Sequence, residues 1–322
     1  MTSPVTRILF LLLIVSVCSC KNHSNQEEEM PIYKAQVAYE IKAALGEGAL
    51  WNHTTKEFYW VDIEGKTFNI FNPSSGTNKV YPTPSRAGTV VPYTANEVIL
   101  AMEDGIHSMD LKTGETKMLT DMSADLEGSR LNDGKCDPSG RLWVGSMHFN
   151  QTKGAAKLFM VDQKLEYIAK KDSVTISNGI VWSKDRKTMY YIDTPTAEIK
   201  AYDYDDTSGA ISNERVVVKV QSEMGFPDGM TIDEEDKLWV GMWSGNAVLR
   251  FDPETGKVIG EIEVPAKNVT ACAFGGENLD VMYITTASLG MSAEEEEQLP
   301  KAGSIFKVAL DVKGVPSNFF KQ

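Results

Sequence analysis

The sequence predicts an all-β protein that folds as a six-bladed β-propeller, and three observations support this. Beyond residue 38 the chain consists of short aromatic and β-branched runs separated by Gly, Asp, Asn and Pro turns, with no long stretch of helical periodicity. The runs fall into six units with a common order of strands and turns between about residues 45 and 315. The units recur about every 45 residues, which is the length of a propeller blade. A two-sheet β-sandwich is the alternative, but six matching repeats favour the propeller.

Each unit is an apolar strand, a polar turn, a strand with central aromatic or aliphatic pairs, and a third strand that ends in a D-x-x-[TS]-G-like turn. The units begin at Leu50, Val91, Cys136, Val181, Ile232 and Ala273. The last unit contains an acidic insertion, MSAEEEEQLP at 291–300, which is expected to form a turn of surface helix.

Composition limits the classes of partner. The 322 residues are 42% hydrophobic and 24% charged, which is ordinary for a globular protein with a large core. The formal charge of −13 and the pI near 4.9 argue against nucleic acid or an anionic membrane surface as the partner. An acidic protein suits a bound cation, although acidic surfaces are also common without one.

The N-terminus has the features of an export signal. Arg7 precedes an apolar run at 8–17 that is too short to span a bilayer, and small residues follow before Cys20. This pattern predicts a lipoprotein signal peptide at 1–19, lipidation of Cys20, a flexible tether at 20–38 and a propeller at 39–322. The protein is then expected in a bacterial cell envelope, on the periplasmic side or the outer-membrane surface, touching membrane only through its lipid. Ordinary secretion with cleavage elsewhere is the alternative.

Two cysteines remain in the mature chain, Cys136 and Cys272. Each lies in a strand-like apolar context, which predicts buried free thiols. A disulfide between them stays open, because an exported protein meets an oxidising compartment.

Polar residues precede the first apolar strand of several units, and they are the candidate site. They are Glu47, Arg130, Asn132, Asp133, Asn178 and Asp228. Each alone is a turn signal, and the run from Arg130 to Lys135 has the composition of a polar loop. In a propeller, however, the first strand of each blade lines the central channel. Four junctions of one ring therefore direct carboxylate, amide and guanidinium groups to one place.

The types of residue in this set predict the chemistry. Carboxylate and amide oxygens are hard ligands for Ca²⁺, Mg²⁺, Mn²⁺ or Zn²⁺. The sequence has no Cys/His spacing for tetrahedral zinc, no HExxH, no GxSxG and no P-loop. The four histidines do not group, and only His148 is placed where it could approach the channel. This pattern favours metal-assisted hydrolysis over a serine nucleophile.

Five motifs carry a resemblance to a known family. They are LGEGALWN, SRLNDGKCDPSGRLWVGSM, SNGIVWSKDRKTMYYIDT, FPDGMTIDEEDKLWVGMWSGNAVLRFDPETGK and ACAFGGENLDVMYITTA. In this order, across residues 39–312, the chain resembles the gluconolactonase/regucalcin (senescence marker protein) family. The resemblance implies a six-bladed propeller with one divalent cation in its central channel and hydrolysis of a small sugar (aldono-) lactone. We expect a monomer that binds no nucleic acid.

The resemblance also implies roles for individual residues. Glu47, Asn178 and Asp228 match the metal ligands, and Asp228 also matches the general acid/base that activates water. Arg130 and Asn132 match residues that contact substrate oxygens.

Some positions depart from the pattern or have no clear role. Asn150 stands where some members have a glutamate that holds substrate, which leaves the sugar open, and Ser146 replaces the usual residue of a GTM-like segment. Asp133 either orients its neighbours or only shapes a turn. Two alternative functions remain at this stage. One is a propeller esterase or phosphotriesterase with another substrate, and the other is a non-catalytic calcium-binding lipoprotein.

Overall fold

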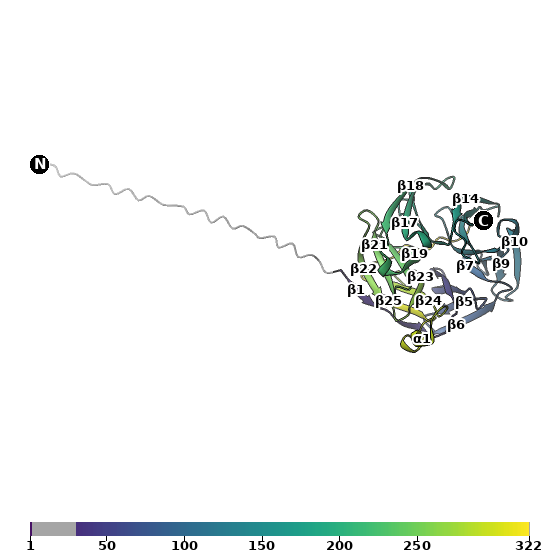
Figure 1. The fold of residues 1–322 in the computed structure, drawn as a ribbon, viewed down its shortest axis with the longest axis horizontal. Helices are drawn as coiled ribbons and strands as arrows, with labels where there is room; N and C mark the ends of the chain where they lie inside the picture. Colours follow the sequence, from purple (N-terminus) through teal and green to yellow (C-terminus); the bar gives the residue numbers. More distant parts are fainter. Residues whose placement is uncertain (2–29, 322) are drawn as a thin grey trace.

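Six sheets, antiparallel except for one added strand, surround a central channel in the computed structural model, which describes Met1 and residues 30–321 (Figure 1). The prediction of a six-bladed β-propeller is confirmed. Blade 1 consists of β3 (Gly46–Asn52), β4 (Glu57–Asp62), β5 (Thr67–Asn72) and β6 (Thr77–Pro82). Blade 2 consists of β7 (Ala87–Pro92), β8 (Glu97–Met102), β9 (Gly105–Asp110) and β10 (Thr116–Asp121). Blade 3 consists of β11 (Ser129–Cys136), β12 (Leu142–His148), β13 (Ala156–Val161) and β14 (Tyr167–Val174).

Blades 4 to 6 continue the same order around the ring. Blade 4 consists of β15 (Ser177–Trp182), β16 (Thr188–Asp193), β17 (Glu198–Asp205) and β18 (Ala210–Lys219). Blade 5 consists of β19 (Phe226–Ile232), β20 (Leu238–Trp243), β21 (Ala247–Asp252) and β22 (Lys257–Glu263). Blade 6 contains β23 (Asn268–Gly275), β24 (Val281–Ala287) and β25 (Ile305–Ala309). Short 3₁₀ turns are η1 (Ser123–Asp125), η2 (Thr194–Thr196) and η3 (Ser222–Met224). The helix α1 (Ala293–Gln298) forms within the acidic insertion, as predicted, and begins with a capping box of Ser292 and Glu295.

The first strand of each blade lies innermost and the following strands run outward. The inner strands β3, β7 and β15 are buried at every residue. The fourth strands, such as β6, β10 and β18, are mostly exposed. The sequence repeat indicated only three strands per unit, because an exposed outer strand has few apolar residues to mark it.

Two strands from the N-terminal side extend blades 5 and 6 at their outer edges, and they correct the predicted domain boundary. β1 (Ile32–Lys34) pairs in parallel with β22 of blade 5, and β2 (Gln36–Tyr39) pairs antiparallel with β25 of blade 6. The predicted tether at 20–38 is therefore wrong at its end, since residues 32–38 belong to the propeller. The predicted signal peptide and Cys20 lie outside the described residues. In the part of the chain that the structure describes, no helix has the length and apolar character needed to cross a membrane.

The far end of the channel is closed by the C-terminal segment. Residues 315–318 lie against the ends of the inner strands. The Asn318 side-chain amide donates to the Cys136 carbonyl at 3.3 Å, and the Lys321 backbone N–H donates to Gly140 at 3.0 Å. Cys136 and Cys272 are both buried and free, which confirms the prediction.

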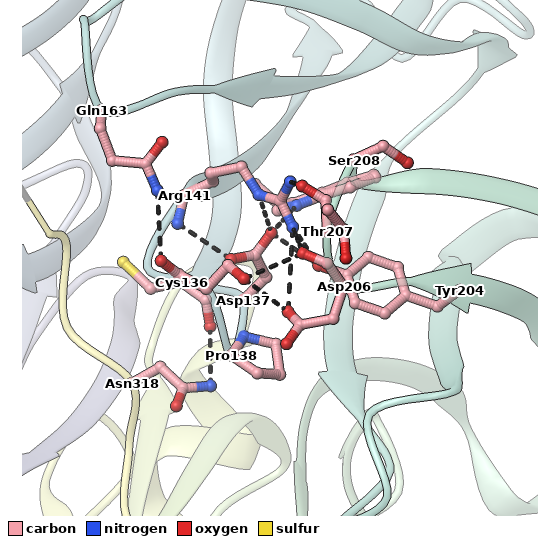
Figure 2. A network of polar contacts seen from close by, with 12 residues as sticks. Cys136, Asp137, Pro138, Arg141, Gln163, Tyr204, Asp206, Thr207, Ser208 and Asn318 are labelled. Carbon is pink, nitrogen blue, oxygen red and sulfur yellow. Dashed lines mark hydrogen bonds and ion pairs between the residues drawn. The ribbon is translucent and has the colours of Figure 1, made fainter.

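A buried ion pair in blade 3 is hydrogen-bonded to blade 4 (Figure 2). The carboxylate of Asp137, fully buried, accepts hydrogen bonds from Arg141 Nε at 2.6 Å, Trp143 Nε1 at 2.9 Å and the Tyr204 hydroxyl at 2.7 Å. The Arg141 guanidinium also donates a hydrogen bond across the blade boundary to the backbone carbonyl of Asp206 at 2.7 Å. In blade 5 a second buried aspartate repeats this arrangement, because Asp233 accepts from Trp239 Nε1 and Arg250 Nε. The six-residue spacing between aspartate and tryptophan is the same in both blades.

Replacing Asp137 with Ala should destabilise the protein by about 3–5 kcal/mol, because the buried Arg141 guanidinium loses its fully buried counter-ion at 2.6 Å and keeps only Asp206 at 3.9 Å. The free energy of unfolding from urea titrations measures this. Asp203→Ala is the matched control, since Asp203 pairs with Arg215 at the surface and should unfold close to the wild type. Equal effects at the two positions would contradict the prediction.

Candidate active site in the channel

A β-bulge in each of four inner strands positions the candidate residues. The pairing of β3 with β4 shifts register between Glu47 and Leu50, and β11 against β12 shifts between Leu131 and Gly134. The same irregularity occurs between Ser177 and Ile180 in β15, and between Pro227 and Met230 in β19. A bulge leaves its extra residue unpaired and redirects the side chain. The sequence predicted that the candidate residues lie in polar loops just before the inner strands. This prediction is wrong, because the residues lie within the strands.

Glycine follows four of the candidate residues, Glu47, Asp133, Asn178 and Asp228, and neighbouring inner strands approach closely at two of these glycines. A Cβ on Gly179 would lie 2.6 Å from the Met230 Cβ of blade 5. A Cβ on Gly229 would lie 2.6 Å from the Ala271 Cβ of blade 6. The Asn-Gly and Asp-Gly pairs, which read as turns in the sequence, here allow the narrow ring at the channel.

The redirected side chains meet in one cavity of about 510 Å³ at the open end of the channel. Five predicted site residues line it, namely Glu47, Arg130, Asn132, Asn178 and Asp228. Each is at most 6% exposed. Side chains from four blades thus line one cavity, as the propeller geometry led us to expect.

A chain of hydrogen bonds fixes the amide side chains. Arg130 donates to Asn132 Oδ1, and Asn132 Nδ2 donates to Asn178 Oδ1 at 2.9 Å and to the Ser177 carbonyl at 2.7 Å. Asn178 Nδ2 donates to Thr194 Oγ1 at 2.7 Å, and Thr194 donates to the Pro227 carbonyl at 2.8 Å. Both amides are held in one orientation, so the Oδ1 atom of each is set by the network.

Glu47 and Asp228 in the cavity, and Asp133 near them, are buried carboxylates with unused oxygen atoms. Among the described residues, Glu47 Oε2, Asp133 Oδ2 and Asp228 Oδ1 are buried without a hydrogen-bond partner, as is Trp182 Nε1 at the other end of the channel. Asp133 Oδ1 accepts from the backbone N–H of Gly134, so this side chain does shape the bulge. Buried carboxylate oxygens without donors are costly unless a cation or a proton compensates them.

The pKa values show that the charged form of the buried carboxylates is unfavourable here. Burial, followed by the charge of Asp133, raises the pKa of Glu47 to about 8, although Arg130 opposes the shift. Burial and the charges of Glu47 and Asp133 raise the pKa of Asp228 well above its usual value. Burial lowers the pKa of Arg130 to about 10, so its guanidinium stays charged at neutral pH. Lys135 adds a second positive charge, and its Nζ donates to the Met230 carbonyl.

The donor set fits one divalent cation. Glu47 and Asp228 provide unpaired carboxylate oxygens, and Asn178 provides an amide oxygen in the same cavity. Hard oxygen ligands of this kind suit Ca²⁺, Mg²⁺ or Mn²⁺, and also Zn²⁺ in an oxygen site. Within the described residues, no three His, Cys, Asp or Glu side chains are grouped closely enough to hold a metal by themselves. The amide oxygen of Asn178 would add a third protein ligand to the two carboxylates.

Other residues lie differently from expectation. His148 does not line the cavity; its Nδ1 faces the loop that follows β12, where it accepts from the Asn150 backbone N–H. Asn150 is exposed, and its neighbour Gln151 reaches the cavity instead. Ser146 bonds to the backbone of Lys157. Sequence reasoning missed Thr194, because nothing in the TPT of η2 distinguishes it from an ordinary turn.

Comparison with known proteins identifies the family. The SMP-30/Gluconolactonase/LRE-like region matches residues 45–288. A proposed sugar lactone lactonase of Bacillus subtilis, YvrE, is 39% identical over 275 residues, which cover 85% of this chain and 94% of that protein. Regucalcin of Danio rerio is 34% identical over 290 residues, with 89% and 98% covered.

A solved structure agrees with the sequence matches. The crystal structure of regucalcin from Agrobacterium tumefaciens, which is described as a calcium-binding protein, has a TM-score of 0.86 and 26% identity. The match covers 91% of this chain and 99% of that one. The resemblance that the motifs carry is confirmed, and the chain belongs to the SMP-30/gluconolactonase/LRE-like family.

Proposed function

We propose that the protein is a metal-dependent hydrolase that opens sugar (aldono-) lactones. The observation that carries the proposal is the pair of unpaired, buried carboxylate oxygens of Glu47 and Asp228 beside the Asn178 amide in a cavity of substrate size. The naming of YvrE as a sugar lactone lactonase supports the reaction, and the naming of a regucalcin as calcium-binding supports the cation.

Glu47, Asn178 and Asp228 would hold the cation. Bound there, it would polarise the lactone carbonyl and favour negative charge on the carbonyl oxygen. Asp228 would accept the proton of the attacking water, since a bound cation beside it would favour its ionised form.

The hydrogen bonds already present determine which atoms of Asn132 and Arg130 can donate to a substrate and which can accept from it. Both N–H groups of the Asn132 amide are already used, so Asn132 can only accept from a substrate hydroxyl, through Oδ1. The Arg130 NH1 group is used by Leu131 and Asn132, which leaves Nε and NH2 as donors to a substrate oxygen. A donor and an acceptor side by side match the hydroxyl groups of a sugar ring.

Acid release from a panel of aldono-lactones tests the function. The protein without residues 1–20 is stripped with a chelator, and Ca²⁺, Mg²⁺, Mn²⁺ or Zn²⁺ is added back. We expect release well above the spontaneous rate only with an added cation, and the best ion identifies the cofactor. A folded protein that binds cations but accelerates no lactone would instead favour a phosphotriester substrate or a non-catalytic binding protein.

A further inference from the structure

The mouth of the cavity has an apolar rim above the polar floor. The floor consists of the site residues described above. The rim residues that also line the cavity are Leu45, Met147, Phe149, Ile176, Pro195, Phe226, Trp243 and Leu289. They come from blades 3, 4, 5 and 6 and from the segment that enters blade 1, so they form an arc around most of the opening.

Three rim residues are large, apolar and exposed. Phe149, Phe226 and Leu289 are 47%, 51% and 44% exposed, and they belong to blade 3, blade 5 and the loop after β24 of blade 6. A single exposed apolar side chain is ordinary, but several around one cavity mark a surface that binds an apolar group. Trp243 pairs directly with Phe226 across β19 and β20, which makes the arc continuous in blade 5.

The charged groups on the remaining side of the mouth are already paired. Arg86 binds Glu64 at 2.9 Å and Glu103 at 2.9 Å, and its guanidinium also lies 5.6 Å from the centre of the Phe149 ring. Thr194, at the floor, is engaged by Asn178 and Pro227. Gln151 is the one other polar side chain that lines the cavity among the described residues, so the hydroxyl groups of a substrate find their polar partners mainly at the floor.

We propose that the preferred substrate is an aldono-lactone that carries an apolar or aryl substituent, with its polar ring on the floor and the substituent against the rim. This inference rests on the proposed hydrolase function. Water adds its oxygen to the carbonyl carbon, the ring C–O bond breaks, and the ring oxygen receives the proton, which gives the open hydroxy acid with its substituent retained. The cavity volume of about 510 Å³ lies within the range of about 300–1,000 Å³ for pockets that hold ligands larger than one sugar.

Two lactones with the same reacting ring provide the test, D-glucono-1,5-lactone and its 6-O-benzyl ether. With the cation restored, we expect kcat/KM for the benzyl ether to exceed that for the parent lactone by about tenfold, because the benzyl group leaves water for the rim. The double variant Phe149→Ser/Leu289→Ser should abolish this preference. Phe226 is left unchanged because it lies two residues from Asp228.

Ile168→Ser is the matched control. Ile168 is 55% exposed on the outer strand β14, so its loss removes a similar apolar surface away from the mouth and should keep the preference. Equal kcat/KM for the two lactones, or a preference that survives the double variant, overturns the inference and leaves the hydrolase function standing. If neither lactone is opened with any cation, the proposed function fails and the inference fails with it.

Discussion

Asp228→Asn should lower kcat on a hydrolysed lactone by about 10²–10⁴-fold, the usual contribution of a general base. Asparagine keeps the shape of the side chain but cannot accept a proton from water at neutral pH. The fold should survive, since the variant removes one of three carboxylates that repel one another in a buried cluster. Without the cation, the variant should be at least as stable as the wild type at neutral pH.

Steady-state kinetics at saturating cation, with thermal unfolding of the same samples, measures both effects. Asp203→Asn, at an exposed surface pair, is the control and should keep full activity. A variant at position 228 that keeps more than a tenth of the wild-type kcat would remove Asp228 from the mechanism. If the wild type has no activity and the variant loses only cation affinity, the protein is a binding protein.

Raising the pH should destabilise the cation-free protein, and adding a divalent cation should reverse this. The pKa of Glu47 is near 8 in the folded protein against an ordinary value of 4.5, and burial is the main cause. Between these pH values the folded state holds a proton that the unfolded state releases. The free energy of unfolding therefore falls as the pH rises from about 4.5 to 8, by at most ~1.4 kcal/mol per pH unit for this group. Asp228 acts in the same direction.

Urea unfolding at pH 5, 6.5 and 8, with chelator and with added Ca²⁺, checks the sign. A cation present at about 100 times its dissociation constant should stabilise the folded state by about 2.7 kcal/mol. Glu47→Gln is the matched control, because it keeps the shape but cannot ionise, and its cation-free profile should be flatter. A cation-free wild type that becomes more stable from pH 5 to 8 would show that the carboxylates are compensated by other groups.

The propeller and the members of its site could be predicted because the apolar strands, and the polar residues before them, recur at a regular interval in the sequence. Six buried inner strands repeat an apolar pattern, and four candidate residues stand directly before a glycine, which the narrow ring requires at Gly179 and Gly229. The repeat also showed which positions share a level of the channel. That brought Glu47, Asn178 and Asp228 into one group with Arg130 and Asn132, and the family resemblance singled out the three as metal ligands.

What could not be predicted depends on contacts between distant segments. β1 and β2 look like part of a polar tether, because their partners Glu261 and Lys307 lie more than 200 residues away. A bulge and a turn share the same Asn-Gly or Asp-Gly signal, so strand and loop could not be separated locally. The apolar rim was missed because its members, such as Phe149 and Leu289, are single residues in unrelated loops.

The pairing of β2 with β25 determines when this molecule can finish folding. Gln36 meets Lys307, so the outer strand of blade 6 comes from the start of the chain and the other three come from its end. During synthesis β2 is made among the first segments and waits for its partner until nearly the whole chain has emerged. Such long-range pairing is slow, and the unpaired edges are open to wrong partners until it forms. A chain that stops before residue 305 therefore remains an open ring, whatever the state of its first five blades.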